Sequence, residues 1–210
     1  MVIQKKTSRL PGLIYDLMLG LFFLPFGGEA KVRRKMVQLL EVKEGEEVLE
    51  LGCGTARLSQ FLLKQEKALE LFALDLSPSM LSRACQNLAR EKVSLILADA
   101  SQLPFAEQCF DHIITSLSLH EMPTSARLRA IQECYRVLRK SGRLTVIEYR
   151  SPDQPFLKKI DSLLGLLEPS TRTEMLKRGL GSELKSAGFS LIKTRALGFG
   201  VFEVLWAVKP

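Results

Sequence analysis

Short apolar segments alternate with helix-length amphipathic stretches from Glu46 to Tyr149, and this alternation constrains the fold more than any other feature. Five apolar segments have the length of strands: 46–51, 70–75, 93–98, 110–116 and 143–149. Three stretches between them have helical spacing: 55–65, 77–90 and 125–138, the last ended by a turn at 140–142. Strands and helices in this alternation pair as parallel strands through right-handed crossovers. The pattern predicts an α/β, Rossmann-like open sheet with helices on both faces.

The last 60 residues have a different pattern. Residues 156–167 and 173–187 are expected to be helical, and two strands follow at 189–196 and 202–208. Strands this close in sequence pair antiparallel. We therefore expect a C-terminal antiparallel hairpin to complete a mostly parallel sheet.

The composition is that of a globular domain, with 46% hydrophobic and 25% charged residues in a chain of 210. It excludes disordered, collagen-like and disulfide-scaffold classes. The length and the lack of a linker predict one domain: residues 1–43 as an N-terminal helical cover, 44–150 as a cofactor-binding core, and 151–210 as a substrate-side part. The net charge of +7 is uneven, since residues 1–43 carry eight basic and three acidic side chains. A basic end either meets a phosphate-bearing surface or is simply solvated, and both interpretations stay open.

Four cysteines without a CxxC pair, and only two histidines, argue against a zinc site and favour a reducing compartment, and no metal-binding residues are expected. Residues 10–26 are apolar and follow basic residues, as in a signal sequence, but they include Asp16 and two prolines. We interpret this segment as an amphipathic or buried helix. The expected location is cytoplasmic, with peripheral contact at the inner face of the membrane left open.

A glycine turn follows the first expected strand, in Glu50-Leu51-Gly52-Cys53-Gly54-Thr55-Ala56. Gly52 and Gly54 allow a sharp turn and close approach of a ligand. A dinucleotide fingerprint would need glycine at position 57, where this chain has Arg57, which counts against a nicotinamide-dependent oxidoreductase.

Acidic side chains end three successive strands. Glu50 ends the first, Asp75 the second, and Asp99 follows the third. Open α/β sheets bind ligands outside the carboxyl ends of their strands. We expect Glu50 to face the ammonium end of a nucleoside ligand, Asp75 its ribose and Asp99 its base; for any one of them alone, capping or solvation is the competing interpretation.

Five motifs together resemble class I S-adenosylmethionine-dependent methyltransferases over about residues 36–150. They are VLELGCGTARLS, ALDLSPSML, ADASQLPF, FDHIITSLSLHEM and VLRKSGRLTVIEY. Within this class the sequence is similar to the quinone-biosynthesis C-methyltransferases and related small-molecule enzymes, through QLPF after Asp99 and Tyr15-Asp16-Leu17-Met18 near the start. Leu19 stands where that group has asparagine, and Ala56 where the family usually has glycine.

The resemblance implies S-adenosyl-L-methionine as the cofactor and a set of residues that bind it. The set is Glu50, Gly52, Cys53, Gly54, Asp75, Leu76, Met80, Asp99, Ala100, Ser116 and Leu117. In the family, the residue matching Glu50 and the glycine loop hold the methionine moiety. Leu76 or Met80 flanks the adenine, and Ser116 or Leu117 closes the site.

His120 is the candidate general base, because it follows the fourth strand at the sheet rim and imidazole titrates near neutral pH. Capping or packing of the next helix is the alternative role. Glu121 either orients His120 or is solvated. Tyr149, at the end of the fifth strand, is a second candidate that contacts the acceptor or packs in the core, and Tyr15 is a candidate for closing over the pocket.

The acceptor is expected to be a small molecule. The chain lacks the Asn/Asp-Pro-Pro-Tyr/Phe loop of enzymes that methylate amino groups of nucleic acids, so we do not expect nucleic acid as a partner. Two acceptor classes stay open. One is a hydrophobic quinone precursor or lipid, with the apolar N-terminal stretch lying on a membrane. The other is a soluble amine or hydroxyl acceptor, with that stretch as a lid. A domain that binds S-adenosylmethionine without transferring the methyl group also stays open. The oligomeric state is left open.

Overall fold

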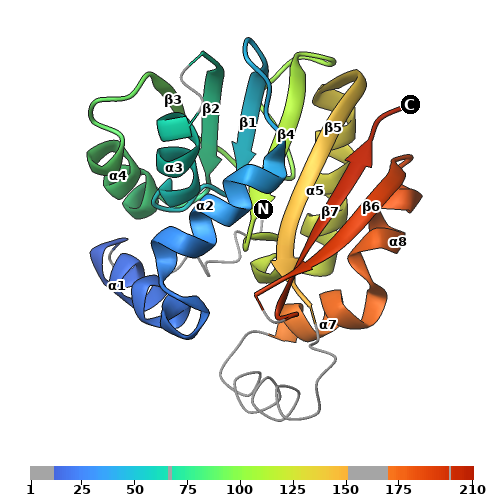
Figure 1. Cartoon of the computed structure of the whole chain (residues 1–210). Coiled ribbons are helices and arrows are strands. Elements are labelled where there is room, and N and C mark those ends of the chain that lie inside the picture. Colours follow the sequence, from blue (N-terminus) through green and yellow to red (C-terminus); the bar gives the residue numbers. More distant parts are fainter. Residues whose placement is uncertain (1–11, 66–67, 151–169, 199) are drawn as a thin grey trace.

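A computed structural model describes residues 12–65, 68–150, 170–198 and 200–210. Its strands form one seven-stranded sheet in the order β3-β2-β1-β4-β5-β7-β6 (Figure 1). The bounds are β1 Glu47–Leu51, β2 Glu70–Asp75, β3 Val93–Leu97, β4 Phe110–Ser116, β5 Leu138–Tyr149, β6 Ser190–Leu197 and β7 Phe202–Val208. The first five strands are parallel, and β7 runs antiparallel between β5 and β6. The predicted Rossmann-like sheet with an antiparallel C-terminal hairpin is confirmed.

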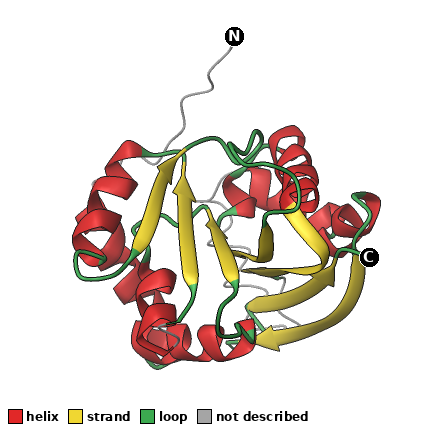
Figure 2. Cartoon of the chain, turned by 90° about the horizontal axis from the view of Figure 1, so that it is seen from above, coloured by secondary structure: helices red, strands yellow, loops and turns green. Residues whose placement is uncertain are grey.

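Helices cover both faces of the sheet, as Figure 2 shows from above. On one side lie α1 (Gly12–Phe23), the short 3-10 helix η1 (Leu24–Phe26), α2 (Glu29–Leu40), α3 (Arg57–Gln65) and α4 (Pro78–Asn87). On the other side lie α5 (Thr124–Val137), α7 (Ser170–Arg178) and α8 (Leu180–Ser186). Each group packs its apolar residues against the sheet, so the core consists of two layers of side chains separated by the strands.

Several predicted helix ends are corrected by left-handed residues. The predicted helix 55–65 begins only at Arg57, because Ala56 adopts a φ of 57° within the glycine turn. Gly179, with a φ of 76°, divides the predicted helix 173–187 into α7 and α8. The helix expected to reach residue 90 ends at Asn87. The predicted helix at 156–167 lies outside the described residues.

The turn predicted at 140–142 is also corrected. Helix α5 ends at Val137, and β5 begins directly at Leu138. Ser141, with a φ of 60°, bends the strand, and the pairing of β5 with β4 shifts register there before resuming at Arg143. The lysine, serine and glycine that suggested a helix end are therefore a kink inside one long strand.

The chain order reverses between β1 and β4, which are neighbours although β2 and β3 separate them in sequence. At this switch point the loops after the two strands diverge, and open α/β sheets bind ligands there. Glu50 precedes the end of β1, and Ser116 ends β4. The fold thus places these two predicted site residues on adjacent strands.

Candidate active site

The glycine turn after β1 requires left-handed backbone. Gly52 has a φ of 68° and Gly54 a φ of 55°. A Cβ at Gly52 would lie 2.6 Å from the Cβ of Ser118, so no side chain fits there. Ala56 is buried and left-handed too, which explains why glycine suits this position and shows that this chain forms the turn with alanine.

Glu50 is buried beneath this turn, with 4% of its surface exposed. The Ser59 hydroxyl donates a hydrogen bond to its carboxylate. Burial raises the pKa of Glu50 to about 7, although Ser59 and the charge of Arg33 act in the opposite direction. The carboxyl group is therefore poised between its two protonation states near neutral pH.

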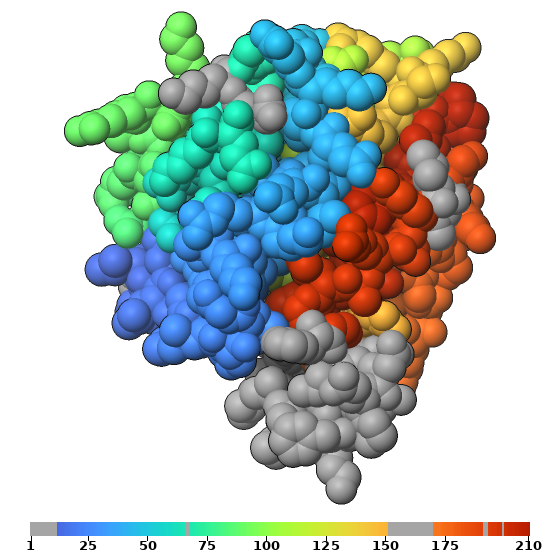
Figure 3. Space-filling model, viewed as in Figure 1, coloured from blue at the N-terminus to red at the C-terminus, as the bar shows by residue number. Residues whose placement is uncertain are grey.

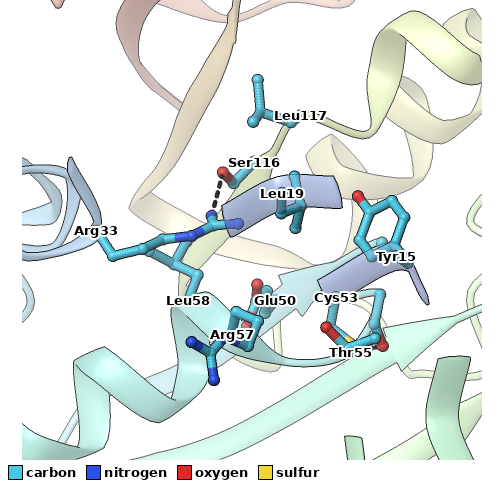
Figure 4. A pocket seen from close by; sticks show the side chains of 12 residues that line it. Tyr15, Leu19, Arg33, Glu50, Cys53, Thr55, Arg57, Leu58, Ser116 and Leu117 are labelled. Carbon is cyan, nitrogen blue, oxygen red and sulfur yellow. Dashed lines mark hydrogen bonds between the residues drawn. The ribbon is translucent and has the colours of Figure 1, made fainter. Parts of the chain in front are cut away.

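Arg33 is a site residue that the sequence reasoning missed. It extends from α2 and is 5% exposed, and Nη1 donates to the Ser116 hydroxyl at 3.4 Å (Figure 4). Its Nε has no hydrogen-bond partner among the described residues. Burial lowers the pKa of Arg33, and the charges of Glu29 and Glu50 oppose that shift. Of the consecutive basic residues 33–35, only Arg33 shares the buried face of α2 with Met36 and Leu40; the helical period is the signal that identifies it.

Asp75 lies at the end of β2 beside the turn. Its two carboxylate oxygens accept hydrogen bonds from the backbone N–H groups of Gly54 at 2.7 Å and Ser77 at 2.8 Å. Burial raises its pKa, and these backbone donors counteract the shift. Asp75 thus already shapes the turn in addition to its predicted role at a ribose.

The predicted adenine-side residues lie around the next two strand ends. Leu76 is exposed, whereas Met80 in α4 is buried, and its N–H donates to the hydroxyl of Ser77, which caps the start of α4. Asp99 is exposed and accepts a hydrogen bond from its own loop, and Ala100 is buried. These side chains border one rim of the sheet with Glu50 and Asp75.

Helix α1 covers the turn from outside. Tyr15 and Leu19 join Glu50, Cys53 and Ser116 in lining a cavity of about 30 Å³, room for only a few water molecules (Figure 4). Burial raises the pKa of Tyr15 to about 12, and the negative charge of Glu121 adds to the shift. The predicted position of Tyr15 at the pocket thus agrees with the structure.

Asp16 fastens α1 in this position. Its carboxylate accepts hydrogen bonds from the Thr55 hydroxyl and from Nε of Arg83, the latter at 2.9 Å. The glycine turn, α1 and α4 are therefore joined through one side chain.

His120 lies in the short helix η2 (Leu119–Glu121), and its Nδ1 is 2.9 Å from the Glu148 carboxylate. The backbone N–H of Leu119 also donates to Glu148, at 2.8 Å. The residue that orients His120 is thus Glu148 and not Glu121, whose side chain is exposed. The sequence interpretation considered only a neighbour in the chain, whereas the contact depends on β5 lying beside β4.

Tyr149 packs edge-on against the His120 ring, with 4.8 Å between ring centroids. Phe22 of α1 and Phe202 of β7 contact its other sides, and the Arg172 guanidinium lies 4.8 Å from its centroid. The tyrosine is half-buried in an aromatic cluster next to the candidate base. Both of its predicted roles, contact with the acceptor and packing, are compatible with this place.

The remaining predicted positions border the same turn. Leu117, left-handed and buried, follows β4, and its N–H donates to the Ile147 carbonyl. Burial raises the pKa of the Cys53 thiol well above its ordinary value, and the charges of Glu50 and Asp75 add to this, so Cys53 is a neutral packing group. Among the described residues, no three histidine, cysteine or acidic side chains cluster as a metal site.

Comparison with known proteins agrees with this geometry. The sequence profile of the methyltransferase domain family matches residues 48–142. A demethylmenaquinone methyltransferase of Thermus thermophilus is 32% identical over 93% of this chain and 96% of its own length. An uncharacterised methyltransferase of Synechocystis sp. is 29% identical over 92% of this chain and 90% of its own length.

The fold has a solved counterpart as well. A SAM-dependent methyltransferase from Aquifex aeolicus superimposes with a TM-score of 0.72 at 17% identity, covering 96% of this chain and all of that one. Sequence and fold lead to one assignment: the chain belongs to the S-adenosylmethionine-dependent methyltransferases, and S-adenosylmethionine is its cofactor.

Proposed function

We propose that this enzyme methylates a ring carbon of a hydrophobic acceptor of the quinol type, with His120 as the base. The observation that carries the proposal is the imidazole of His120, held by Glu148 and packed on Tyr149 at the rim that bears the glycine turn. The name of the Thermus relative, a demethylmenaquinone methyltransferase, supports the acceptor class. The aromatic side chains around Tyr149 suit a flat apolar ring.

The rim residues suit the cofactor. Buried groups of opposite charge, Glu50 and Arg33, match the ammonium and carboxylate of its methionine end. Arg33 Nε pairs with the Glu29 carboxylate only at 3.7 Å and has no hydrogen-bond partner among the described residues. Asp75 suits the ribose hydroxyls, and Gly52 keeps the turn free of side chains. Leu76, Met80, Asp99 and Ala100 remain the proposed adenine contacts.

Helix α1 has to move for the methionine end to enter, because the cavity beneath Tyr15 is far smaller than the cofactor. The hydrogen bonds of Asp16 to Thr55 and Arg83 are the contacts that such a movement breaks. We therefore assign α1 the role of a cover over the bound cofactor.

When bound, the sulfonium supplies an electrophilic methyl group for an in-line displacement that needs alignment more than charge stabilisation. Glu148 holds the Nδ1–H of His120, so Nε2 is the nitrogen that takes the hydroxyl proton of the acceptor. Loss of that proton makes the acceptor ring more nucleophilic. The carbon–methyl bond forms as the sulfur–methyl bond breaks, and neutral S-adenosylhomocysteine leaves. The methylated carbon then loses its proton and the hydroxyl regains the proton that His120 took, so one proton is released overall.

The test is a transfer assay with methyl-labelled S-adenosylmethionine. The acceptors are a naphthoquinol with a short isoprenoid chain, the same ring without the chain, and a set of water-soluble amines and phenols. We expect C-methylation of the prenylated quinol, and a decrease in kcat of about 10²–10⁴-fold in His120→Ala. Labelling of the soluble set alone would favour the soluble acceptor, and cofactor binding by calorimetry without any transfer would favour a binding domain.

A further inference from the structure

Helix α1 exposes an apolar face to the surroundings. Six large hydrophobic side chains, at positions separated by one, three or four residues, are 44–65% exposed: Leu13, Ile14, Leu17, Met18, Leu21 and Leu24. The opposite face of the helix carries Tyr15, Asp16 and Leu19 into the site. An ordinary surface helix has polar residues outside, so the outer face of α1 needs a different explanation.

Basic side chains adjoin this face, and no ion pair with an acid is recorded for them within the described part of the chain. Lys31, Arg34 and Lys35 of α2 are exposed, and Lys31 packs against Gly27, just beyond η1. The two acidic residues between positions 12 and 40 are Asp16 and Glu29, which form ion pairs with Arg83 and Arg57. Figure 3 shows α1 and α2 side by side at the surface of the molecule.

We infer that this face docks on an anionic phospholipid membrane. The six apolar side chains, five from α1 and Leu24 from η1, insert between headgroups and acyl chains, and the three basic side chains of α2 lie at the lipid phosphates. Charge argues against a second copy as the occupant, because a two-fold interface through this patch would bring the two basic clusters together. Within the described residues no single helix is long and apolar enough to cross a bilayer; the helical segments 12–26 and 29–40 reach the required length only together, across an 82° bend.

The inference deepens the proposed function, on which it rests for its purpose. The same helix has its outer face at the lipid and its inner face at the site, where Phe22 contacts Tyr149. A quinol whose isoprenoid chain lies in the membrane would therefore meet the site next to α1.

The experiment is co-sedimentation of the full chain with vesicles. One set is pure phosphatidylcholine and the other contains phosphatidylglycerol. The apolar variant is Leu13→Gln/Leu17→Gln/Leu21→Gln, and its matched control is Leu97→Gln, an equally exposed leucine on β3. The charge variant is Lys31→Glu/Arg34→Glu/Lys35→Glu, and its control is Arg90→Glu/Lys92→Glu, which are exposed elsewhere.

We expect the wild type to bind phosphatidylglycerol vesicles, with the apolar variant bound at least about tenfold more weakly. The charge variant should lose the preference for phosphatidylglycerol, and both controls should bind like the wild type. Circular dichroism and S-adenosylmethionine affinity of each variant establish that it is folded.

Absence of wild-type binding, or equal binding of the apolar variant and Leu97→Gln, overturns the inference. So does a wild-type dimer in light scattering that the apolar variant converts to monomer. Activity on a detergent-solubilised quinol tests the proposed function separately from membrane docking. If the proposed function is right, a variant that loses vesicle binding keeps this activity. A wild type that is inactive on that quinol refutes the proposed function.

Discussion

Nδ1 of His120 donates a hydrogen bond to the Glu148 carboxylate at 2.9 Å, across 28 residues of chain. Glu148 is fully buried, and burial acts to raise its pKa, but the charge and hydrogen bond of His120 hold the pKa of Glu148 below its ordinary value. The carboxylate is thus ionised and stabilises the protonated form of His120. When the imidazole is neutral, the same carboxylate holds the Nδ1–H, so Nε2 is the proton acceptor. This is the arrangement in which a positioning carboxylate supports a base.

The first prediction concerns this pair. Glu148→Gln keeps the shape but removes the charge, so kcat should decrease at least about tenfold, with little change in KM for S-adenosylmethionine. The acidic limb of the pH–rate profile should move to lower pH, because an imidazole without an anionic partner is less basic. Glu91→Gln, which removes an exposed carboxylate next to the edge strand β3, is the control for both readouts. An unmoved limb, with kcat reduced, would assign Glu148 a merely structural role.

Contacts between distant segments are the part of this site that sequence alone did not provide. The glycine turn and the acids after β1 and β2 were predictable because each is local to one strand end. Glu148 and Arg33 were missed, because their roles depend on β5 lying beside β4 and on α2 facing the turn. The prediction of a helix-ending turn at 140–142 was wrong for a related reason. A left-handed residue such as Ser141 suggests a helix end when the strand that pairs with it is not known.

The second prediction concerns pH and stability. The pKa of Glu50 is about 7 in the folded protein, against an ordinary value of 4.5. Between these values the folded state binds more protons than the unfolded state, so the free energy of unfolding falls as pH rises through this window. The difference in free energy of unfolding between wild type and Glu50→Gln should therefore decrease by up to about 3 kcal/mol from pH 5 to pH 8. Urea denaturation at each pH measures it, and Glu107→Gln, an exposed loop residue, should show no such trend.

The third prediction separates two costs of placing a side chain at Gly52 of the glycine turn: the strain of a left-handed backbone, and the collision with Ser118. Gly45 lies outside the turn and serves as the position with strain alone. Gly45→Ala places alanine at a φ of 79° with no atom within 4 Å, so it should lose about 1–2 kcal/mol of stability. Gly52→Ala has a similar φ and in addition collides with Ser118, which should cost about 1–3 kcal/mol more. Adding Ser118→Gly to Gly52→Ala should recover only the stability lost through the collision, and not the stability lost through backbone strain. Equal losses in the two single variants would show that Ser118 yields without cost.

The fourth prediction tests the ribose. Asp75→Asn should weaken binding of S-adenosylhomocysteine at least about tenfold, since a hydrogen bond to a charged group contributes about 1.5–3 kcal/mol. Asp75 also accepts from Gly54 and Ser77, so weakening alone does not identify the ribose. The analogue without ribose hydroxyls should bind wild type and Asp75→Asn with equal affinity in calorimetry. If the variant weakens both ligands by the same factor, Asp75 acts on the turn and the ribose lies elsewhere.

The fifth prediction assigns the buried guanidinium of Arg33 to the carboxylate of the cofactor. Arg33→Met retains much of the buried apolar volume but removes the charge, so S-adenosylmethionine should bind at least about tenfold more weakly, the loss of one charged hydrogen bond. Decarboxylated S-adenosylmethionine lacks the partner and should bind wild type and variant alike. Arg34→Met removes the charge of an exposed neighbour on α2 and serves as the control, with little effect on either ligand. A loss of affinity common to both ligands would mean that Arg33 supports the fold of α2 and does not bind the carboxylate.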